Sequence, residues 1–181
     1  FDARTGKVLW YEPSYFGPPM LHGRRILKGG DERGGSGTAC DLLTGKPVMT
    51  RDPLTGDDIP WRWQRTYGCN TPGASESLVL FRSGAAGFYD LENEGGTGNL
   101  GGIRSSCTLN LIPAGGVLVV PDYTRTCTCS YQNQTSAAFV HQPDVELWTF
   151  TTARPVTGVV RRVGVNLGAP GSRKADDGTL W

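Results

Sequence analysis

Residues 41–46 read DLLTGK, and residues 2–7 read DARTGK. Asp, Thr, Gly and Lys therefore recur at one common offset of 39 residues. The carboxylate of Asp41 is placed to accept hydrogen bonds from backbone N–H groups of its own turn, and Gly45 can adopt the positive φ that a tight reversal needs. The motif therefore predicts a hairpin turn between two antiparallel strands, used in both places.

The spacing of the two turns predicts the architecture. A period near ~40 residues with strands on both sides fits one four-stranded blade of a β-propeller. Trp10 should then pack between neighbouring blades. The third similar segment, residues 52–56 (DPLTG), follows the second copy too closely to be another blade, so we predict a hairpin within an insertion that continues through residues 57–63. The structural repeat positions are Asp2, Thr5, Gly6, Trp10, Asp41, Thr44 and Gly45.

Short apolar runs separated by Gly- and Pro-containing turns cover the rest of the chain, and no segment shows convincing helical periodicity. We predict an all-β chain in which residues 1–150 form about three four-stranded antiparallel blades. Propellers close with roughly four to eight blades, so this would be an open part of a longer propeller. Residues 151–181 should begin a following β unit or linker. Predicted strands include residues 18–22, 25–28, 67–70 (an inner strand), 78–82 and 87–91. Residues 159–171 should form one strand and a turn, and residues 148–150 should end the third blade.

Composition excludes several function classes. The net charge is +1 without a basic block, which argues against a nucleic-acid partner. The longest apolar run, near residues 116–121, has the length of a strand and falls far short of the ~20 residues that span a bilayer. The chain starts at Phe1 inside a repeat motif, so we expect a fragment of a longer protein.

The turn motif followed by Trp10, D-x-x-T-G-K-x-x-W, resembles the repeats of the quinoprotein (pyrroloquinoline-quinone-like, PQQ-like) β-propeller superfamily. Residues 68–69 (GC), 88–91 (FYDL) and the cysteine-containing stretch from Arg104 are similar to a subgroup in Planctomycetes-type bacteria, as is the tail. The resemblance implies an exported bacterial protein, periplasmic or associated with the cell envelope.

The superfamily includes dehydrogenases that use the quinone with Ca²⁺ to oxidise alcohols or sugars, and also scaffold proteins without a cofactor. Redox members often keep two adjacent cysteines near the cofactor, whereas this chain has Cys127-Thr128-Cys129. We therefore expect a non-catalytic binding or scaffold segment of a larger propeller protein. The alternative is part of a quinone-dependent oxidoreductase, with PQQ and calcium as its cofactors. The partners expected are the remaining blades and a small-molecule or carbohydrate ligand.

Five cysteines, four of them between Cys69 and Cys129, indicate an oxidising compartment. Cys40 lies within an apolar strand and is expected to be a small buried side chain. Cys127 and Cys129 are too close along a strand to bond without strain, so we expect each to pair with Cys69 or Cys107. A strained, redox-active Cys127–Cys129 pair and a four-thiolate zinc site remain as alternatives.

Other side chains suggest weaker sites. Asp90, Glu92 and Glu94 resemble the start of a calcium loop, but the position of the closing glutamate is Gly101. His22 and His141 have no partner motif and are expected to be ordinary strand or loop residues. Trp61 and Trp63, if exposed, would suit a carbohydrate surface. Polar side chains near the cysteines were assigned to a channel rim: Arg104, Arg125, Tyr131, Gln132 and Gln134.

Overall fold

The computed structural model describes residues 1–13, 17–30, 35–103, 111–122, 135–145, 148–151 and 156–181. Over these residues the secondary structure consists of strands and turns, with no helix, so the all-β prediction is confirmed. The strands are β1 (Met20–His22), β2 (Arg25–Lys28), β3 (Gly37–Asp41), β4 (Met49–Arg51), β5 (Asp58–Pro60), β6 (Arg62–Trp63), β7 (Gly73–Ala74), β8 (Leu78–Ser83), β9 (Ala85–Asp90), β10 (Thr97–Asn99), β11 (Ile112–Ala114), β12 (Val117–Val120) and β13 (Ala137–Val140).

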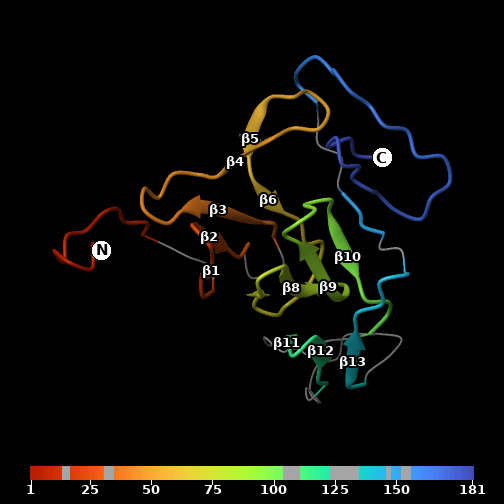
Figure 1. Ribbon diagram of the computed structural model, residues 1–181, viewed down its shortest axis with the longest axis horizontal. Coiled ribbons are helices and arrows are strands. Elements are labelled where there is room, and N and C mark those ends of the chain that lie inside the picture. The colour runs from red at the N-terminus through yellow and green to blue at the C-terminus, as the bar shows by residue number, and fades with distance from the viewer. Residues whose placement is uncertain (14–16, 31–34, 104–110, 123–134, 146–147, 152–155) are drawn as a thin grey trace.

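The strands form three successive antiparallel sheets and one separate hairpin (Figure 1). The first sheet has the order β1-β2-β3-β6, the second β7-β8-β9-β10 and the third β11-β12-β13. Strands that follow each other in the chain are neighbours in each sheet, the pattern of a simple meander. The hairpin is formed by β4 and β5. None of these sheets closes on itself over the described part of the chain.

The β4–β5 hairpin interrupts the outer strand of the first sheet. After the turn at residues 41–46, Pro47 bridges to Cys40 and the Val48 N–H donates to the Ala39 carbonyl, so a fourth strand starts beside β3. The chain then leaves as β4–β5. It returns at Trp61, whose N–H donates to the Val48 carbonyl at 2.8 Å, and β6 completes the pairing with β3. The predicted insertion is therefore present at residues 49–60, but its predicted continuation through residues 61–63 is wrong, because β6 pairs with β3 in the first sheet.

The second sheet is packed on both faces. Val79, Phe81, Tyr89 and Leu91 pack with the first-sheet residues of one buried cluster. The alternate residues Leu80, Ala86 and Phe88 pack with Leu111 and Val120 around the third sheet. Because side chains alternate across a strand, each of β8 and β9 supplies residues to both clusters. The three sheets are therefore stacked face to face, with the second in the middle.

The first sheet contributes two tryptophans to the buried cluster that it shares with the second sheet. This part of the cluster is aromatic. It consists of Leu27, Ala39, Trp61 and Trp63, all less than about a tenth exposed. The Trp63 ring stacks on Phe81 with a centroid distance of 4.6 Å, and the edge of Trp61 meets Tyr89 at 5.7 Å. These two contacts join the first and second sheets.

The structure corrects three strand predictions. Residues 67–70 are not a strand, and the second sheet starts at β7 instead. Phe150 pairs with Thr97 of β10, so residues 148–150 extend the edge of the second sheet rather than end the third. Residues 159–171 form no strand, because within the described residues their backbone has no continuous ladder partner. No described helix has the length and apolar character that crossing a membrane requires.

Candidate functional site

The first strands of the three sheets, β1, β7 and β11, contribute to one cavity of about 390 Å³, named here the inner pocket. Its volume lies within the ~300–1,000 Å³ typical of small-ligand sites. The described lining residues are Pro18, Pro19, Met20, Pro72, Gly73, Ala74, Leu111, Ile112 and Pro113. All of them are nonpolar, so this lining favours an apolar group through shape and burial of surface.

Prolines recur around the inner pocket because they stand at the same edge of each sheet. Pro18 and Pro19 precede β1, Pro72 precedes β7, and Pro113 lies within β11. Proline has no N–H to donate, so it is accepted at a sheet edge where no further strand pairs. This recurrence was the sequence signal for the pocket, and sequence reasoning that followed the cysteines missed it.

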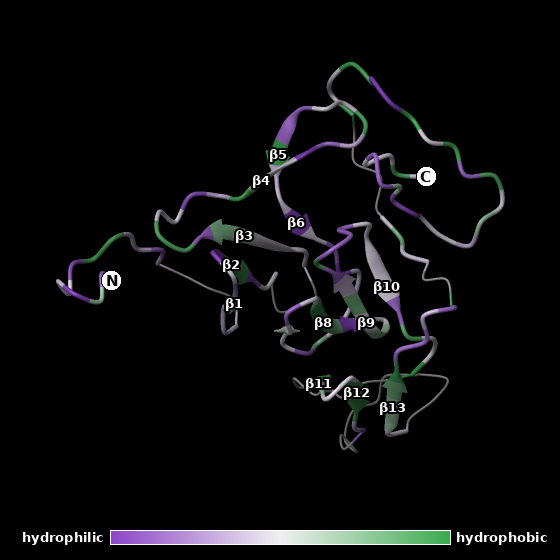
Figure 2. Cartoon of the chain, in the orientation of Figure 1, coloured by the Kyte–Doolittle hydropathy of each residue, from purple (hydrophilic) through white to green (hydrophobic). Residues whose placement is uncertain are grey.

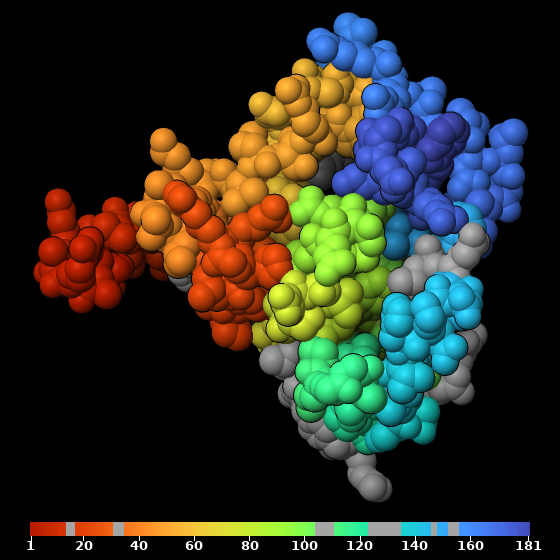
Figure 3. Space-filling view, viewed as in Figure 1, coloured from red at the N-terminus to blue at the C-terminus, as the bar shows by residue number. Residues whose placement is uncertain are grey.

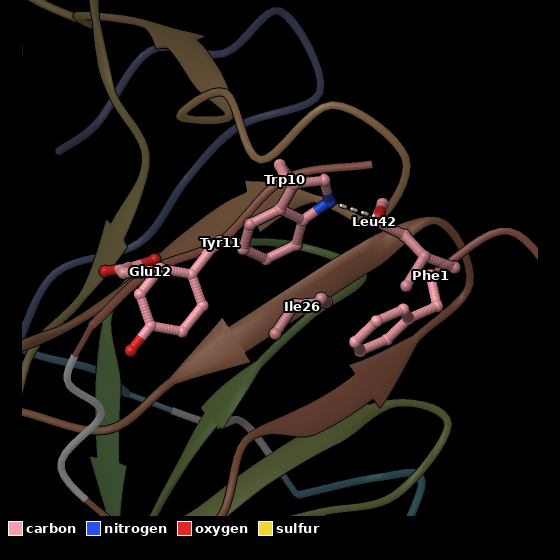
Figure 4. A pocket seen from close by; sticks show the side chains of 6 residues that line it. All are labelled: Phe1, Trp10, Tyr11, Glu12, Ile26 and Leu42. Atoms are coloured by element: carbon pink, nitrogen blue, oxygen red, sulfur yellow. Dashed lines mark hydrogen bonds between the residues drawn. The ribbon is translucent and has the colours of Figure 1, made fainter. Parts of the chain in front are cut away.

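A second pocket of about 300 Å³ lies between the N-terminal arm, residues 1–13, and the outer face of the first sheet (Figure 4). Its lining is Phe1, Trp10, Tyr11, Glu12, Ile26 and Leu42. The indole N–H of Trp10 donates to the Leu42 carbonyl at 2.8 Å. Nζ of Lys28 donates to both carboxylate oxygens of Glu12 at 3.0 Å. These contacts hold the arm against the sheet.

The repeated motif forms one type of turn wherever it occurs. Oδ1 of Asp41 accepts from the N–H groups of Leu43 and Thr44, and the Gly45 N–H donates to the Asp41 carbonyl. Asp2 makes the equivalent bonds in the first copy. The glycines have φ of 69° at Gly6 and 68° at Gly45, in the left-handed region.

Two further segments adopt the same turn. Asp52 accepts from the backbone of Leu54 and Thr55 at the tip of the β4–β5 hairpin. Asp90 accepts from Glu92 and Asn93 after β9. In this last turn Glu94 occupies the glycine position with φ of 52°. These four turns of the described chain thus share one local unit, an Asp that accepts from its own turn and a residue four positions later in the left-handed region.

Asp41 differs from Asp2 because Arg24 lies beside it. The hydrogen bond from the Arg24 guanidinium, with those from Thr44 and Leu43, lowers the pKa of Asp41 from its ordinary value of 3.8 to about 2. Backbone hydrogen bonds from Thr5 and Arg4 lower the pKa of Asp2 without such a cation. Both carboxylates are at the surface, where solvent screens the interaction.

We expect Arg24→Gln to raise the pKa of Asp41 towards that of Asp2 in a carbon-detected NMR titration. A folded-state pKa below the unfolded value stabilises the fold at higher pH, and this contribution is lost as the pH falls from about 4 to about 2. The free energy of unfolding of the variant should therefore fall less steeply as the pH drops from about 4 to about 2. Asp2 is the internal control, and an unchanged Asp41 titration would contradict the assignment of Arg24.

The three residues predicted to start a calcium loop are each engaged in other contacts. Asp90 binds its own turn, Glu92 accepts from the Ser77 hydroxyl at 3.0 Å, and Glu94 pairs with Arg25 of β2 at 2.9 Å. No group of three or more His, Cys, Asp or Glu side chains in the described residues is placed to hold a metal ion. Glu94 instead links the second sheet to the first.

The cysteine predictions are only partly covered by the structure. Cys69 is exposed and Cys40 is buried, and within the described residues both thiols are free. Cys40 lies on β3 as expected, and burial raises the pKa of its thiol. Cys107, Cys127 and Cys129 lie outside the described residues, as do the rim candidates Arg104, Arg125, Tyr131, Gln132 and Gln134.

The tryptophan surface predicted for carbohydrate is absent at these positions. Trp61 and Trp63 are 2% and 0% exposed, because they form the interface between the first two sheets. The imidazole of His22 forms a hydrogen bond of 2.7 Å with the Glu76 carbonyl oxygen, which joins a turn of the first sheet to a turn of the second. His141 follows β13 and is exposed.

Comparison with models of known protein families, with curated proteins and with solved structures finds no match for this chain.

Proposed function

We propose that the chain forms consecutive blades of a PQQ-like β-propeller and acts as a non-catalytic binding segment of a larger exported bacterial protein. Three stacked meander sheets that follow one another in the chain support the blade interpretation. The Trp10 contact with the next copy of the turn supports it as well, because it joins one repeat to the next. In this proposal the first strand of each sheet is the inner strand of a blade.

The observation that carries the binding function is the inner pocket. It lies where β1, β7 and β11 meet, which in a propeller is the side nearest the central channel. Its nonpolar lining supplies contact area and shape, whereas general acid–base or nucleophilic catalysis needs ionisable or nucleophilic groups. The ligand we propose is therefore an apolar molecule or an apolar side chain of a partner.

The uncharged fluorescent dye Nile red tests this pocket directly. We expect saturable binding with a blue-shifted emission, reduced about tenfold in affinity by Ile112→Asp, because a carboxylate in an apolar site must be desolvated. Val140→Asp is the matched control, since Val140 is similarly exposed on the third sheet but does not line the pocket. Equal binding by both variants would refute the proposed site.

The oxidoreductase alternative predicts a different outcome. Incubation with pyrroloquinoline quinone and Ca²⁺, followed by dye reduction with alcohols and sugars, should give no activity if the segment only binds. Quinone bound at equilibrium together with substrate-dependent reduction would overturn the non-catalytic proposal.

A further inference from the structure

Residues 159–167, VVRRVGVNL, form an exposed run named here the valine-rich segment. Figure 1 shows the chain here as an open excursion at the edge of the molecule, and Figure 2 shows hydrophobic residues recurring along it. Val159, Val163, Val165 and Leu167 are 79%, 64%, 62% and 91% exposed. Exposed apolar side chains concentrated in one segment are typical of an interaction surface.

The segment is held in place by backbone and side-chain contacts, including hydrogen bonds from the Arg162 side chain to the turn at residues 177–179. The backbone N–H groups of Arg161 and Arg162 donate to the Leu54 carbonyl, at 2.8 and 3.1 Å, on the tip of the β4–β5 hairpin. Gly164 packs so closely against the C-terminal residues that a Cβ added there would lie 2.5 Å from the Leu180 carbonyl oxygen. Figure 3 shows these C-terminal residues packed beside the valine-rich segment. A segment anchored in this way loses less conformational entropy when it binds.

The backbone beyond these anchors has hydrogen-bonding capacity left. Among the described residues, none donates to or accepts from the backbone of Val163, Val165 or Leu167. Elsewhere the chain covers its own edges, with Phe150 bridging to Thr97 and Ser172 bridging to Thr149. Unpaired N–H and C=O groups beside β-branched side chains are a template for the addition of another strand.

Charge indicates the kind of strand that fits. The valine-rich segment contains Arg161 and Arg162 and no acidic residue. Arg162 is already engaged within the chain, because its Nη1 donates to the Asp177 carbonyl at 2.9 Å and to the Thr179 hydroxyl at 3.2 Å, and lies 3.7 Å from the Asp177 carboxylate. Arg161 has no ion pair within the part of the chain that the structure describes. Self-pairing of two copies would bring four guanidinium groups together, whereas opposite charges across a strand pair stabilise it.

We propose that the valine-rich segment is a docking strand for an extended, acidic segment of a partner protein. The partner strand pairs through the free backbone groups near Val163 and Val165. Its apolar side chains contact the valines, and its carboxylates lie opposite Arg161 and Arg162. This interaction is separate from the inner pocket, so either proposal can fail without the other.

A synthetic peptide tests the docking strand. The probe is a fluorescein-labelled Thr-Val-Thr-Val-Glu-Glu-Val-Thr-Val, with a second peptide carrying Lys-Lys in place of Glu-Glu. By fluorescence anisotropy with the full chain, we expect the acidic peptide to bind about tenfold more tightly than the basic one at low salt, with the preference shrinking as salt rises. The variant Arg161→Glu, which leaves the Arg162 bonds to Asp177 and Thr179 in place, should abolish the preference.

A further variant tests the contribution of backbone hydrogen bonds to peptide binding. Val163→Pro removes an N–H donor and should lower the affinity for the acidic peptide about tenfold. Val156→Pro is the control, because Val156 is exposed outside the segment. Circular dichroism and the melting temperature establish that each variant is folded. Equal affinity for both peptides, no effect of Val163→Pro, or a concentration-dependent dimer in sedimentation that excludes the peptide would overturn the proposal.

Discussion

Trp63→Ala should cost about 3–5 kcal/mol in the free energy of unfolding, a large part of the ~5–15 kcal/mol that stabilises an ordinary domain. Trp63 is fully buried on β6, stacks on Phe81 of β8, and lies against Gly37 of β3. Truncation therefore opens a cavity at the interface between the first two sheets. Equilibrium unfolding in urea, followed by circular dichroism, measures the loss.

Two comparisons make this prediction specific. Trp63→Phe keeps an aromatic ring against Phe81, and the indole N–H has no hydrogen-bond partner in the described structure, so this variant should lose much less stability. Arg62→Ala changes the exposed neighbour on the same strand and should stay within about 0.5 kcal/mol of the parent. If Trp63→Ala were as mild as Arg62→Ala, the stacked interface would be wrong.

Gly45→Ala should be the most damaging change at a turn. Alanine at a φ of 68° costs about 1–2 kcal/mol, because its Cβ crowds the backbone in the left-handed region. In addition, a Cβ at this position would lie 2.6 Å from the Trp10 ring. Trp10 must then move, and its hydrogen bond to the Leu42 carbonyl, worth about 1 kcal/mol, is lost.

The same substitution at Gly56 separates the two effects. Gly56 has φ of 74° in the equivalent turn, but an added Cβ would meet only the Arg161 side chain, at an ordinary 3.9 Å. Gly56→Ala should therefore show the conformational cost alone. In a Trp10→Ala background, the cost of Gly45→Ala should fall to that of Gly56→Ala. A double-mutant cycle on denaturant midpoints measures this coupling, and additive effects would show that Trp10 does not pack on the turn.

Local chemistry made the turns and the fold class predictable. An Asp accepting from the backbone and a Gly with positive φ need only neighbouring residues, so residues 2–7 and 41–46 could be interpreted directly, as could the hairpin at residues 52–56. The turn at Asp90 is harder to recognise, because Glu94 stands where glycine is expected. Its left-handed backbone is accompanied by the ion pair with Arg25, a contact with a distant strand.

The inner pocket was not predicted, because it depends on contacts between sheets. Alternation of apolar and polar residues cannot say whether Trp61 and Trp63 face solvent or another sheet, and the structure buries both. Likewise the prolines near β1, β7 and β11 are far apart in sequence and share a cavity only when the sheets stack. The prediction that Cys69 pairs with another cysteine concerns residues outside the described structure and stays a prediction.

The sequence by itself thus determined the all-β class and the Asp–Gly turns, since both follow from hydrogen bonds and backbone angles within a few residues. Only the tertiary structure decided which faces are buried, that Phe150 pairs with Thr97, and that the first strands of the three sheets line one pocket. The physical reason is that burial of apolar surface is not directional. Any packing that removes such surface from water is stabilised, so which packing forms depends on contacts across the whole chain.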